Sequence, residues 1–286
     1  MVFVHSFQAA PMLQTKFRSL ETGLKVVLVD YAYSVECVHK FGHTIELYTD
    51  ALGAEFLKLI PYDKVHIVTN DITTNWHFAA SIKFKALQSM SLDQCLIDGD
   101  IFLENPIAFE LIKNADTDIV VSMYEPVERI FKPELMRELF YTCRDAKQPG
   151  YELPDVSEVK GWYNTSLLKF NSESLKQEYI RQYIAHIKEF ENRDINPGIW
   201  PDIVVEQFNI EALLRNTNST ISMINPYYDI DDEFAYKIGF CHLGVAKEIA
   251  HSYYLRMLQT INYQLSVDLQ NYYIYLMKDF IPNYKP

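Results

Sequence analysis

Short apolar segments alternate with helical patterns along the first 122 residues, and this alternation limits the possible folds more than any other feature. The strand patterns lie at residues 1–7, 44–48, 65–68, 95–97 and 118–122. The helical patterns lie between them, at residues 26–40, 53–60, 78–90 and 106–113. Strands that alternate with helices form parallel βαβ units. The sequence therefore predicts an α/β fold with a mixed, mostly parallel sheet flanked by helices, and ligands at the carboxyl ends of its strands.

The second half of the chain has a less regular pattern. Residues 126–154 are rich in charge, proline and glycine and predict a helix followed by a loop. Further elements are expected as an apolar piece at 166–170 and helices at 175–190 and 201–215. Residues 247–280 contain neither proline nor glycine and predict a long helical stretch. We therefore expect one domain over residues 1–246 and a C-terminal helical extension over residues 247–286 that packs on it.

The acidic balance of the chain excludes one class of partner. Its 286 residues include 26 Lys plus Arg against 38 Asp plus Glu, which gives a formal net charge of −12. Such a charge repels nucleic acid and anionic lipid, so no nucleic-acid partner is expected. A nucleotide can still bind, because a divalent ion can bridge protein carboxylates to a diphosphate.

The cysteines and the N-terminus favour a cytoplasmic location. The four cysteines are widely spaced and form no C-x-x-C pair, so free thiols are expected. The first residues lack the basic start and long apolar run of a signal peptide, and no window of about 18 residues is purely apolar. We expect no transmembrane segment. Peripheral membrane contact stays open, although residues 247–280 contain only three Lys or Arg.

Two carboxylates one residue apart, Asp98 and Asp100, are the sharpest chemical feature of the sequence. They lie between the apolar runs 95–97 and 101–103. At the end of a strand both can face the same edge of the sheet, and Gly99 between them lets the backbone approach a ligand closely. Carboxylate oxygens are ligands that suit Mn²⁺ or Mg²⁺. A solvated acidic turn would explain the same spacing, because D-x-D is short and common.

The D-x-D motif in its apolar frame, well inside the chain and after an N-terminal strand, resembles that of GT-A glycosyltransferases. Upstream, residues 76–87 resemble the helix that those enzymes place before the motif, and Lys83 matches a basic residue that reaches the donor. The resemblance implies that Asp98 and Asp100 hold Mn²⁺ or Mg²⁺ on the diphosphate of a nucleoside diphosphate sugar.

The segment W-Y-N-T-S-L-L, which begins at Trp162, resembles the F-N-T-G-hydrophobic segment of the same family. The resemblance assigns Asn164 to the sugar and acceptor region, although Ser166 stands where glycine is usual. The neighbouring rings of Trp162 and Tyr163 could stack on the face of a sugar.

Two later segments complete the resemblance. Residues 201–207 resemble an acidic helix start, from which Asp202 or Glu206 would take the acceptor proton if the reaction inverts the anomeric carbon. Residues 241–247 resemble an H-x-x-G-x-x-K segment, in which His242 would complete the metal shell and Lys247 would meet the diphosphate. Here the spacing after His242 is one residue shorter than usual, and Glu248 replaces a proline.

Polar residues at the ends of the first two predicted strands resemble a bacterial glycosyltransferase-like branch of this fold. They are His5 and Ser6 near the end of the first strand and Asp50 just after the second. The resemblance places all three where the nucleoside of the donor would bind. Ordinary polar residues at strand ends would give the same pattern.

Taken together, the resemblance implies a divalent-metal-dependent glycosyltransferase. The donor would be a nucleoside diphosphate sugar, with a UDP-sugar favoured, and the acceptor a hydroxyl of a glycan, a lipid-linked molecule or a small molecule. Two alternatives stay open. One is a non-catalytic protein that keeps the frame to bind a nucleotide or a sugar. The other is a haloacid-dehalogenase-like phosphatase, in which the first aspartate of D-x-D is a nucleophile.

Overall fold

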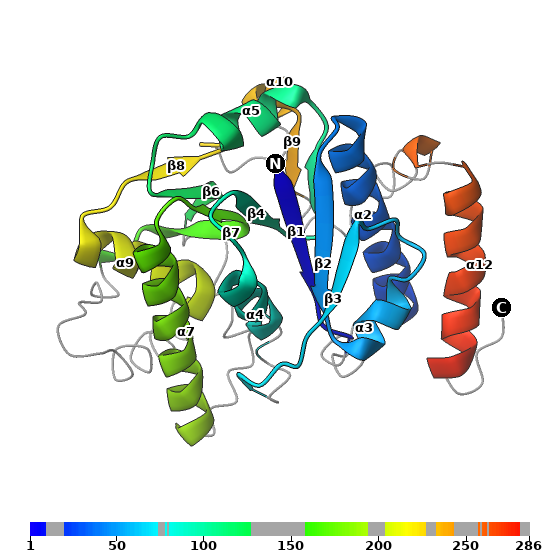
Figure 1. Cartoon of the computed structure of the whole chain (residues 1–286), viewed down its shortest axis with the longest axis horizontal. Coiled ribbons are helices and arrows are strands. Elements are labelled where there is room, and N and C mark those ends of the chain that lie inside the picture. Colours follow the sequence, from blue (N-terminus) through cyan, green and yellow to red (C-terminus); the bar gives the residue numbers. More distant parts are fainter. Residues whose placement is uncertain are drawn as a thin grey trace.

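A seven-stranded sheet organises the computed structural model, which describes residues 1–9, 20–73, 78, 80–126, 158–193, 204–226, 233–242, 257, 259–261 and 263–280. The strand order is β3-β2-β1-β4-β7-β6-β8, so β4 is the central strand (Figure 1). The strands are β1 (Val2–Phe7), β2 (Thr44–Thr49), β3 (Lys64–Ile67), β4 (Gln94–Ile97), β6 (Ile119–Pro126), β7 (Gly161–Phe170) and β8 (Ile221–Met223). Two further strands, β5 (Ile101–Leu103) and β9 (Phe240–His242), form a separate antiparallel pair.

The pairing directions confirm the predicted mostly parallel sheet. Strand β1 pairs in parallel with both β2 and β4, β2 pairs in parallel with β3, and β6 pairs in parallel with β8. Only β7 runs the other way, antiparallel to its neighbours β4 and β6. The sequence pattern identified the apolar part of β7 at residues 166–170 but missed its first half, where the aromatic pair Trp162 and Tyr163 is followed by the polar Asn164 and Thr165.

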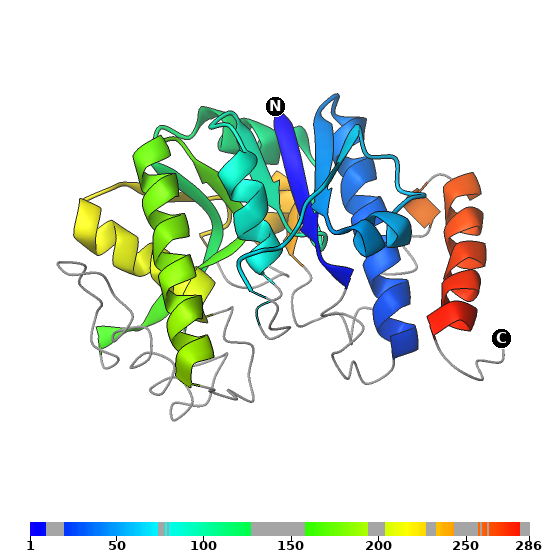
Figure 2. The ribbon, with the colours of Figure 1, turned by 60° about the horizontal axis from the view of Figure 1, so that its bottom comes forward.

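Helices cover both faces of the sheet, as Figures 1 and 2 show. They are α2 (Leu20–Lys40), α3 (Ala51–Phe56), α4 (Ser81–Ser89), α5 (Pro106–Asn114), α7 (Glu173–Arg193), α9 (Asn209–Thr217), α10 (Glu233–Ile238) and α12 (Tyr263–Phe280). Neighbouring residues of one strand belong to different buried clusters. In β4, for example, Ile97 packs with residues of α2 and α5, whereas Leu96 packs with residues of α4 and α7. Because side chains alternate along a strand, these clusters lie on opposite faces of the sheet.

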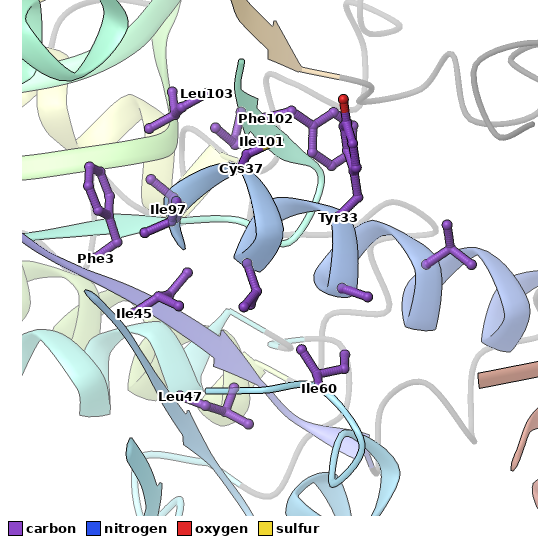
Figure 3. Packing of buried hydrophobic residues seen from close by; sticks show 14 of the residues in the cluster. Phe3, Tyr33, Cys37, Ile45, Leu47, Ile60, Ile97, Ile101, Phe102 and Leu103 are labelled. Carbon is purple, nitrogen blue, oxygen red and sulfur yellow. The ribbon is translucent and has the colours of Figure 1, made fainter. Parts of the chain in front are cut away.

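Helix α2 contains the predicted helix over residues 26–40 and extends it towards the N-terminus. The β-branched run at its start resembles a strand, yet the whole of Leu20–Lys40 is helical and ends before Gly42, whose φ of 73° only glycine adopts without strain. Figure 3 shows Tyr33 and Cys37 of this helix beside Ile97, Ile101 and Phe102. Helix α2 is thus held by packing on the sheet rather than by its local helix propensity.

Helix α3 begins two residues before the predicted position. Asp50 caps it, because its side chain accepts a hydrogen bond from the Gly53 amide, and the helix ends at Phe56 instead of continuing to residue 60. Helix α5 has the start expected from its sequence, with an Asn105 cap and Pro106 in the first turn.

The C-terminal helix α12 packs on α2 and contributes Leu269, Tyr272 and Leu276 to the same buried cluster. The Tyr272 hydroxyl also donates a hydrogen bond to the Glu55 carbonyl at the end of α3. Helix is therefore confirmed over Tyr263–Phe280, while residues 247–256 lie outside the described part of the chain. Among the described helices, none is both long and apolar enough to cross a membrane.

One buried histidine makes the fold sensitive to acid. His186 of α7 is wholly buried, and neither ring nitrogen has a hydrogen-bond partner within the described part of the chain. Burial lowers the pKa of His186 from 6.5 to about 4. The folded state keeps this imidazole neutral while the unfolded chain takes up a proton below about pH 6.5, so stability falls as the pH drops from 6.5 towards 4.

We predict that His186→Leu reduces this acid sensitivity. Through His186, the wild-type protein should lose about 2 kcal/mol of unfolding free energy between pH 7 and pH 5. The variant lacks that term and also removes two unsatisfied nitrogens from the interior. Urea unfolding at both pH values measures the difference, and equal losses in variant and wild type would contradict the assignment.

Candidate active site at the carboxyl edge of the sheet

The Asp98–Gly99–Asp100 turn lies at the carboxyl end of β4, the central strand, where the sequence placed it. The Asp98 amide donates to the Ser166 carbonyl of β7 at 2.7 Å, and the Ile101 amide donates back to the Asp98 carbonyl at 3.0 Å. The turn is thus fixed at both ends by backbone hydrogen bonds, and β5 begins directly after it.

The β5–β9 pair brings a distant histidine to this turn. Ile101 of β5 is the register partner of His242 of β9. The His242 Nε2 consequently lies 3.9 Å from Oδ2 of Asp100, and both side chains are mostly buried. This is within the distance expected if the two side chains share a ligand, and the sequence prediction that His242 approaches the D-x-D pair agrees with it.

The donor atoms of this pair fit a divalent ion only in part. Within the described residues, no group of three Asp, Glu, His or Cys side chains is arranged to hold a metal ion. Asp100 and His242 provide two donors of suitable chemistry, and Mg²⁺ in particular is usually held by one or two carboxylates together with substrate phosphate oxygens. The two side chains therefore supply only part of the coordination that a divalent ion needs, and other ligands would have to complete it.

A buried ammonium joins Asp98 to a second carboxylate. The Lys83 Nζ of α4 lies 3.0 Å from Asp98 Oδ1 and 2.6 Å from Glu206 Oε1. The Lys83 and Glu206 side chains are only 9% and 7% exposed, whereas Asp98 keeps 33% of its side-chain surface exposed. Lys83 and Glu206 are therefore shielded from solvent, and Asp98 is the member of the network that solvent reaches.

The charges of this network keep Lys83 ionised, but the pKa of Asp98 is raised to about 7, so that its ionised form is disfavoured. Burial lowers the pKa of Lys83, but the carboxylates of Asp98 and Glu206 outweigh burial, so that its pKa is raised and the ammonium stays charged. Burial raises the pKa of Asp98, Lys83 lowers it, and the neighbouring carboxylates of Asp100 and Glu206 raise it further. An additional cation beside Asp98 and Asp100 would relieve the repulsion between their carboxylates.

Glu206 lies in a π-helix, Val204–Phe208, at the start of the helix predicted over 201–215. Its Oε1 also accepts a hydrogen bond from Thr165 Oγ1 at 2.6 Å, and its backbone carbonyl accepts one from Tyr179. Short π-helical turns occur frequently at functional sites. Asp202, the other carboxylate of this segment, lies outside the described residues, as does Lys247.

Asn164 is buried in the sheet, and both polar atoms of its side chain are hydrogen-bonded there. Its Oδ1 accepts from the Ser122 hydroxyl at 2.7 Å and from the Ser166 amide at 2.9 Å, while Nδ2 donates to Glu125 at 2.7 Å. These contacts bridge an irregularity in the β6–β7 register. The structure places Asn164 as a link within the sheet beside the site, and Ser166 supplies a backbone donor that glycine would equally provide.

The three residues expected at the nucleoside occupy different environments. His5 is wholly buried, with Nδ1 2.8 Å from the Tyr62 hydroxyl and Nε2 3.1 Å from the Ser34 hydroxyl. Because Ser34 donates its single hydrogen to the Ile101 carbonyl, Nε2 of His5 must carry the proton. Burial lowers the pKa of His5 to about 3, so this neutral form persists.

Ser6 and Asp50 lie nearer the surface than His5. The Ser6 carbonyl accepts a hydrogen bond from the Tyr31 hydroxyl at 2.8 Å, and the Asp50 carboxylate caps α3. Both residues keep part of their surface exposed. Ser6 is one of the last two residues of β1 and Asp50 directly follows β2, and both strands run parallel to β4 and end at the same edge of the sheet.

The reason for glycine in the D-x-D motif differs from the expected one. A Cβ added at Gly99 would lie 2.2 Å from Cε2 of Tyr31, so the turn approaches a protein ring rather than leaving room for a ligand. Tyr31 cannot readily move, because its hydroxyl bonds Ser6 and its ring packs on His5 and Phe7. No sequence pattern linked Tyr31 to the motif, since the contact joins a helix to a turn far along the chain.

The match to a family model covers nearly the whole chain. The model of a family of unknown function, DUF6734, matches residues 1–281. The chain belongs to the DUF6734 family. A comparison with curated proteins found no match.

Solved structures with some similarity to this DUF6734 chain include two of the galactosyltransferase LgtC. One, in complex with donor and acceptor sugar analogues, is 12% identical, with a TM-score of 0.40 and coverage of 78% of this chain and 73% of the other. The second, an active-site mutant of LgtC, is 11% identical, with a TM-score of 0.39 and coverage of 85% and 86%.

We predict that Gly99→Ala destabilises this DUF6734 chain by about 1 to 3 kcal/mol, because the new methyl group overlaps the Tyr31 ring. In a Tyr31→Ala background the same substitution should cost much less, since the obstructing ring is gone. A double-mutant cycle by chemical denaturation measures the coupling. Additive effects would show that the two residues do not meet.

We also predict that Lys83→Met costs about 3 kcal/mol or more, because it leaves two carboxylates beside the interior without their ammonium. Lys85→Met is a matched control in the same helix. Its partner Asp71 is 70% exposed, so the loss there should stay below about 1 kcal/mol. Similar losses at the two positions, measured by urea unfolding, would refute the importance of the buried network.

Proposed function

We propose that this protein is a glycosyltransferase that moves a sugar from a nucleoside diphosphate sugar, with a UDP-sugar favoured, to an acceptor hydroxyl. One observation carries the proposal. The Asp98–Gly99–Asp100 turn lies at the carboxyl end of the central strand, with His242 3.9 Å from Asp100 and a charged lysine against Asp98. Ligands of open α/β sheets bind at this edge.

Asp100 and His242 would hold a divalent ion, Mn²⁺ or Mg²⁺, and the solvent-exposed side of Asp98 would face it. When bound, such an ion acts as a Lewis acid that stabilises the charge on the departing diphosphate. The protein alone is net acidic, so a diphosphate would depend on this ion for its affinity. Lys247, which lies outside the described residues, stays a proposed additional contact to the diphosphate.

Glu206 is better suited to hold Lys83 than to take the proton of the acceptor. Its Oε1 accepts hydrogen bonds from both Lys83 and Thr165, and its side chain is only 7% exposed. Asp202 therefore stays the proposed base for an inverting reaction, while a retaining reaction needs none.

The remaining predicted residues surround this centre. Ser6 at the end of β1 and Asp50 just after β2 are proposed to meet the nucleoside, with His5 supporting them from the interior. Asn164 is proposed to act indirectly, because its amide links β6 and β7 next to Thr165. Residues 1–246 would then form the catalytic domain, and residues 247–286 the extension packed on it.

We predict that Asp100→Asn abolishes divalent-dependent UDP binding while preserving the fold. The substitution keeps the size of the side chain and removes one anionic ligand, so the affinity for UDP in Mn²⁺ should fall by about tenfold or more. Calorimetric titration of UDP and GDP, each with Mn²⁺ and with EDTA, measures the effect. Thermal melting checks that the variant is folded.

The matched control is Asp116→Asn, which removes the same charge from an exposed loop before β6, at the opposite edge of the sheet. It should bind UDP as the wild type does. If wild-type protein binds neither nucleotide in Mn²⁺, or if Asp100→Asn binds as well as wild type, the donor site is refuted. Release of phosphate from p-nitrophenyl phosphate without hydrolysis of a nucleotide sugar would instead favour the phosphatase alternative.

A further inference from the structure

A pair of tyrosines lies beyond the ionic network, on the two strands that extend furthest past the carboxyl end of β4. Tyr124 of β6 and Tyr163 of β7 are register partners, with ring centroids 5.2 Å apart and planes inclined at 68°. Both are half-buried, whereas the neighbouring Trp162 is wholly buried and bonded to Glu125. Trp162 is therefore excluded from the sugar-stacking role expected from the sequence, and Tyr124 takes its place beside Tyr163.

The position of this pair relative to the site follows from the chain geometry. Tyr163 precedes Thr165, which bonds Glu206, by two residues, or about 7 Å along a strand. On the other side, Glu211 follows Glu206 by five residues, or about 7 Å along a helix. Helix α9 contacts β7, so both elements lead outward from the same ionic network.

Polar groups surround the aromatic pair. Helix α9, which carries Glu211 and Arg215, contacts β7, which carries Tyr163. Burial raises the pKa of both Tyr124 and Tyr163, and the Glu211 carboxylate raises it further. The Arg215 guanidinium lowers the pKa of Tyr124. It donates hydrogen bonds to Glu211 at 3.0 Å and to Glu158 at 3.2 Å. Neither tyrosine hydroxyl has a hydrogen-bond partner among the described residues.

This combination matches the surface chemistry of a pyranose. A sugar ring presents an apolar face of C–H groups and a rim of hydroxyls, so it needs an aromatic surface flanked by polar donors and acceptors. The two inclined tyrosine rings form a corner, in which one tyrosine can contact a face of the sugar and the other can contact its edge. An alkyl chain would take the Glu211–Arg215 ion pair out of water without offering it a polar contact, and an acidic protein would repel an anionic head group.

We propose that Tyr124 and Tyr163, with Glu211 and Arg215, form the subsite that binds a saccharide acceptor. The inference rests on the proposed function, because it names the acceptor class for the same site. Of the three acceptor classes that the sequence left open, the subsite selects the glycan. Its sugar would lie about 7 Å from Thr165, one ring away from the carboxylates that are proposed to hold the donor.

A glycan array probed with the fluorescently labelled full-length protein tests the subsite, with and without UDP and Mn²⁺. Wild type should bind a subset of immobilised oligosaccharides. Tyr163→Ala should weaken that binding by about tenfold, because the stacking surface is lost, while Tyr163→Phe, which keeps the ring, should retain most of it. Tyr236→Ala is the matched control, because this tyrosine is 83% exposed and lies on α10. It should have no effect.

Calorimetric titration of UDP with Mn²⁺ on the same variants separates this inference from the proposed function. Unchanged UDP affinity in Tyr163→Ala, together with lost saccharide binding, supports the subsite. Saccharide binding by wild type without any UDP binding would support the subsite and refute the transferase. Absence of saccharide binding in wild type, equal binding in Tyr163→Ala, or loss of both ligands in that variant would overturn the subsite. If Tyr163→Ala does not fold, Tyr163→Leu, which keeps an apolar side chain without the ring, replaces it under the same criteria.

Discussion

The ammonium of Lys83 holds together the elements on which the rest of the site depends. It is hydrogen-bonded or ion-paired to Asp98 after β4, to Glu206 in the π-helix and to the Thr165 carbonyl in β7. Taking these carboxylates from water is unfavourable unless a cation compensates for it. The lysine therefore determines where β4, β7 and the π-helix can meet, and the position of the Asp98–Asp100 turn follows.

Much of the fold could be predicted from the sequence because strand and helix patterns alternate regularly over residues 1–122. Short apolar strands between helical periods gave β1 to β4 nearly at their observed bounds, and the D-x-D pair fell at a central strand as expected. His242 was also expected near Asp100, but only through family resemblance. The physical reason, the β5–β9 pairing, involves strands of three residues, too short to leave a periodic pattern.

Other features depended on contacts between distant segments, which local patterns do not record. Glycine in the motif was attributed to a ligand, whereas Tyr31 occupies that space. Lys83 was expected to meet the donor, yet its ammonium is bound by two carboxylates of the protein. Trp162 was expected to contact a sugar, but its ring is in the core. In each case the residue type was noticed correctly, and its partner lay on an element whose position the sequence does not give.

The antiparallel strand in the middle of the sheet has a consequence for how the protein is made. Strand β4 is flanked by β1 on one side and by β7 on the other, and β5, α5 and β6 all precede β7 in the sequence. A chain that ends before β7 leaves β4 as an edge strand, so the backbone N–H and C=O groups of Leu96 and Ile97 that face β7 in the finished protein are open to neighbouring chains. Such an incomplete chain carries an edge that favours aggregation, and the proposed active site, which also needs β9, forms only once the chain extends as far as His242.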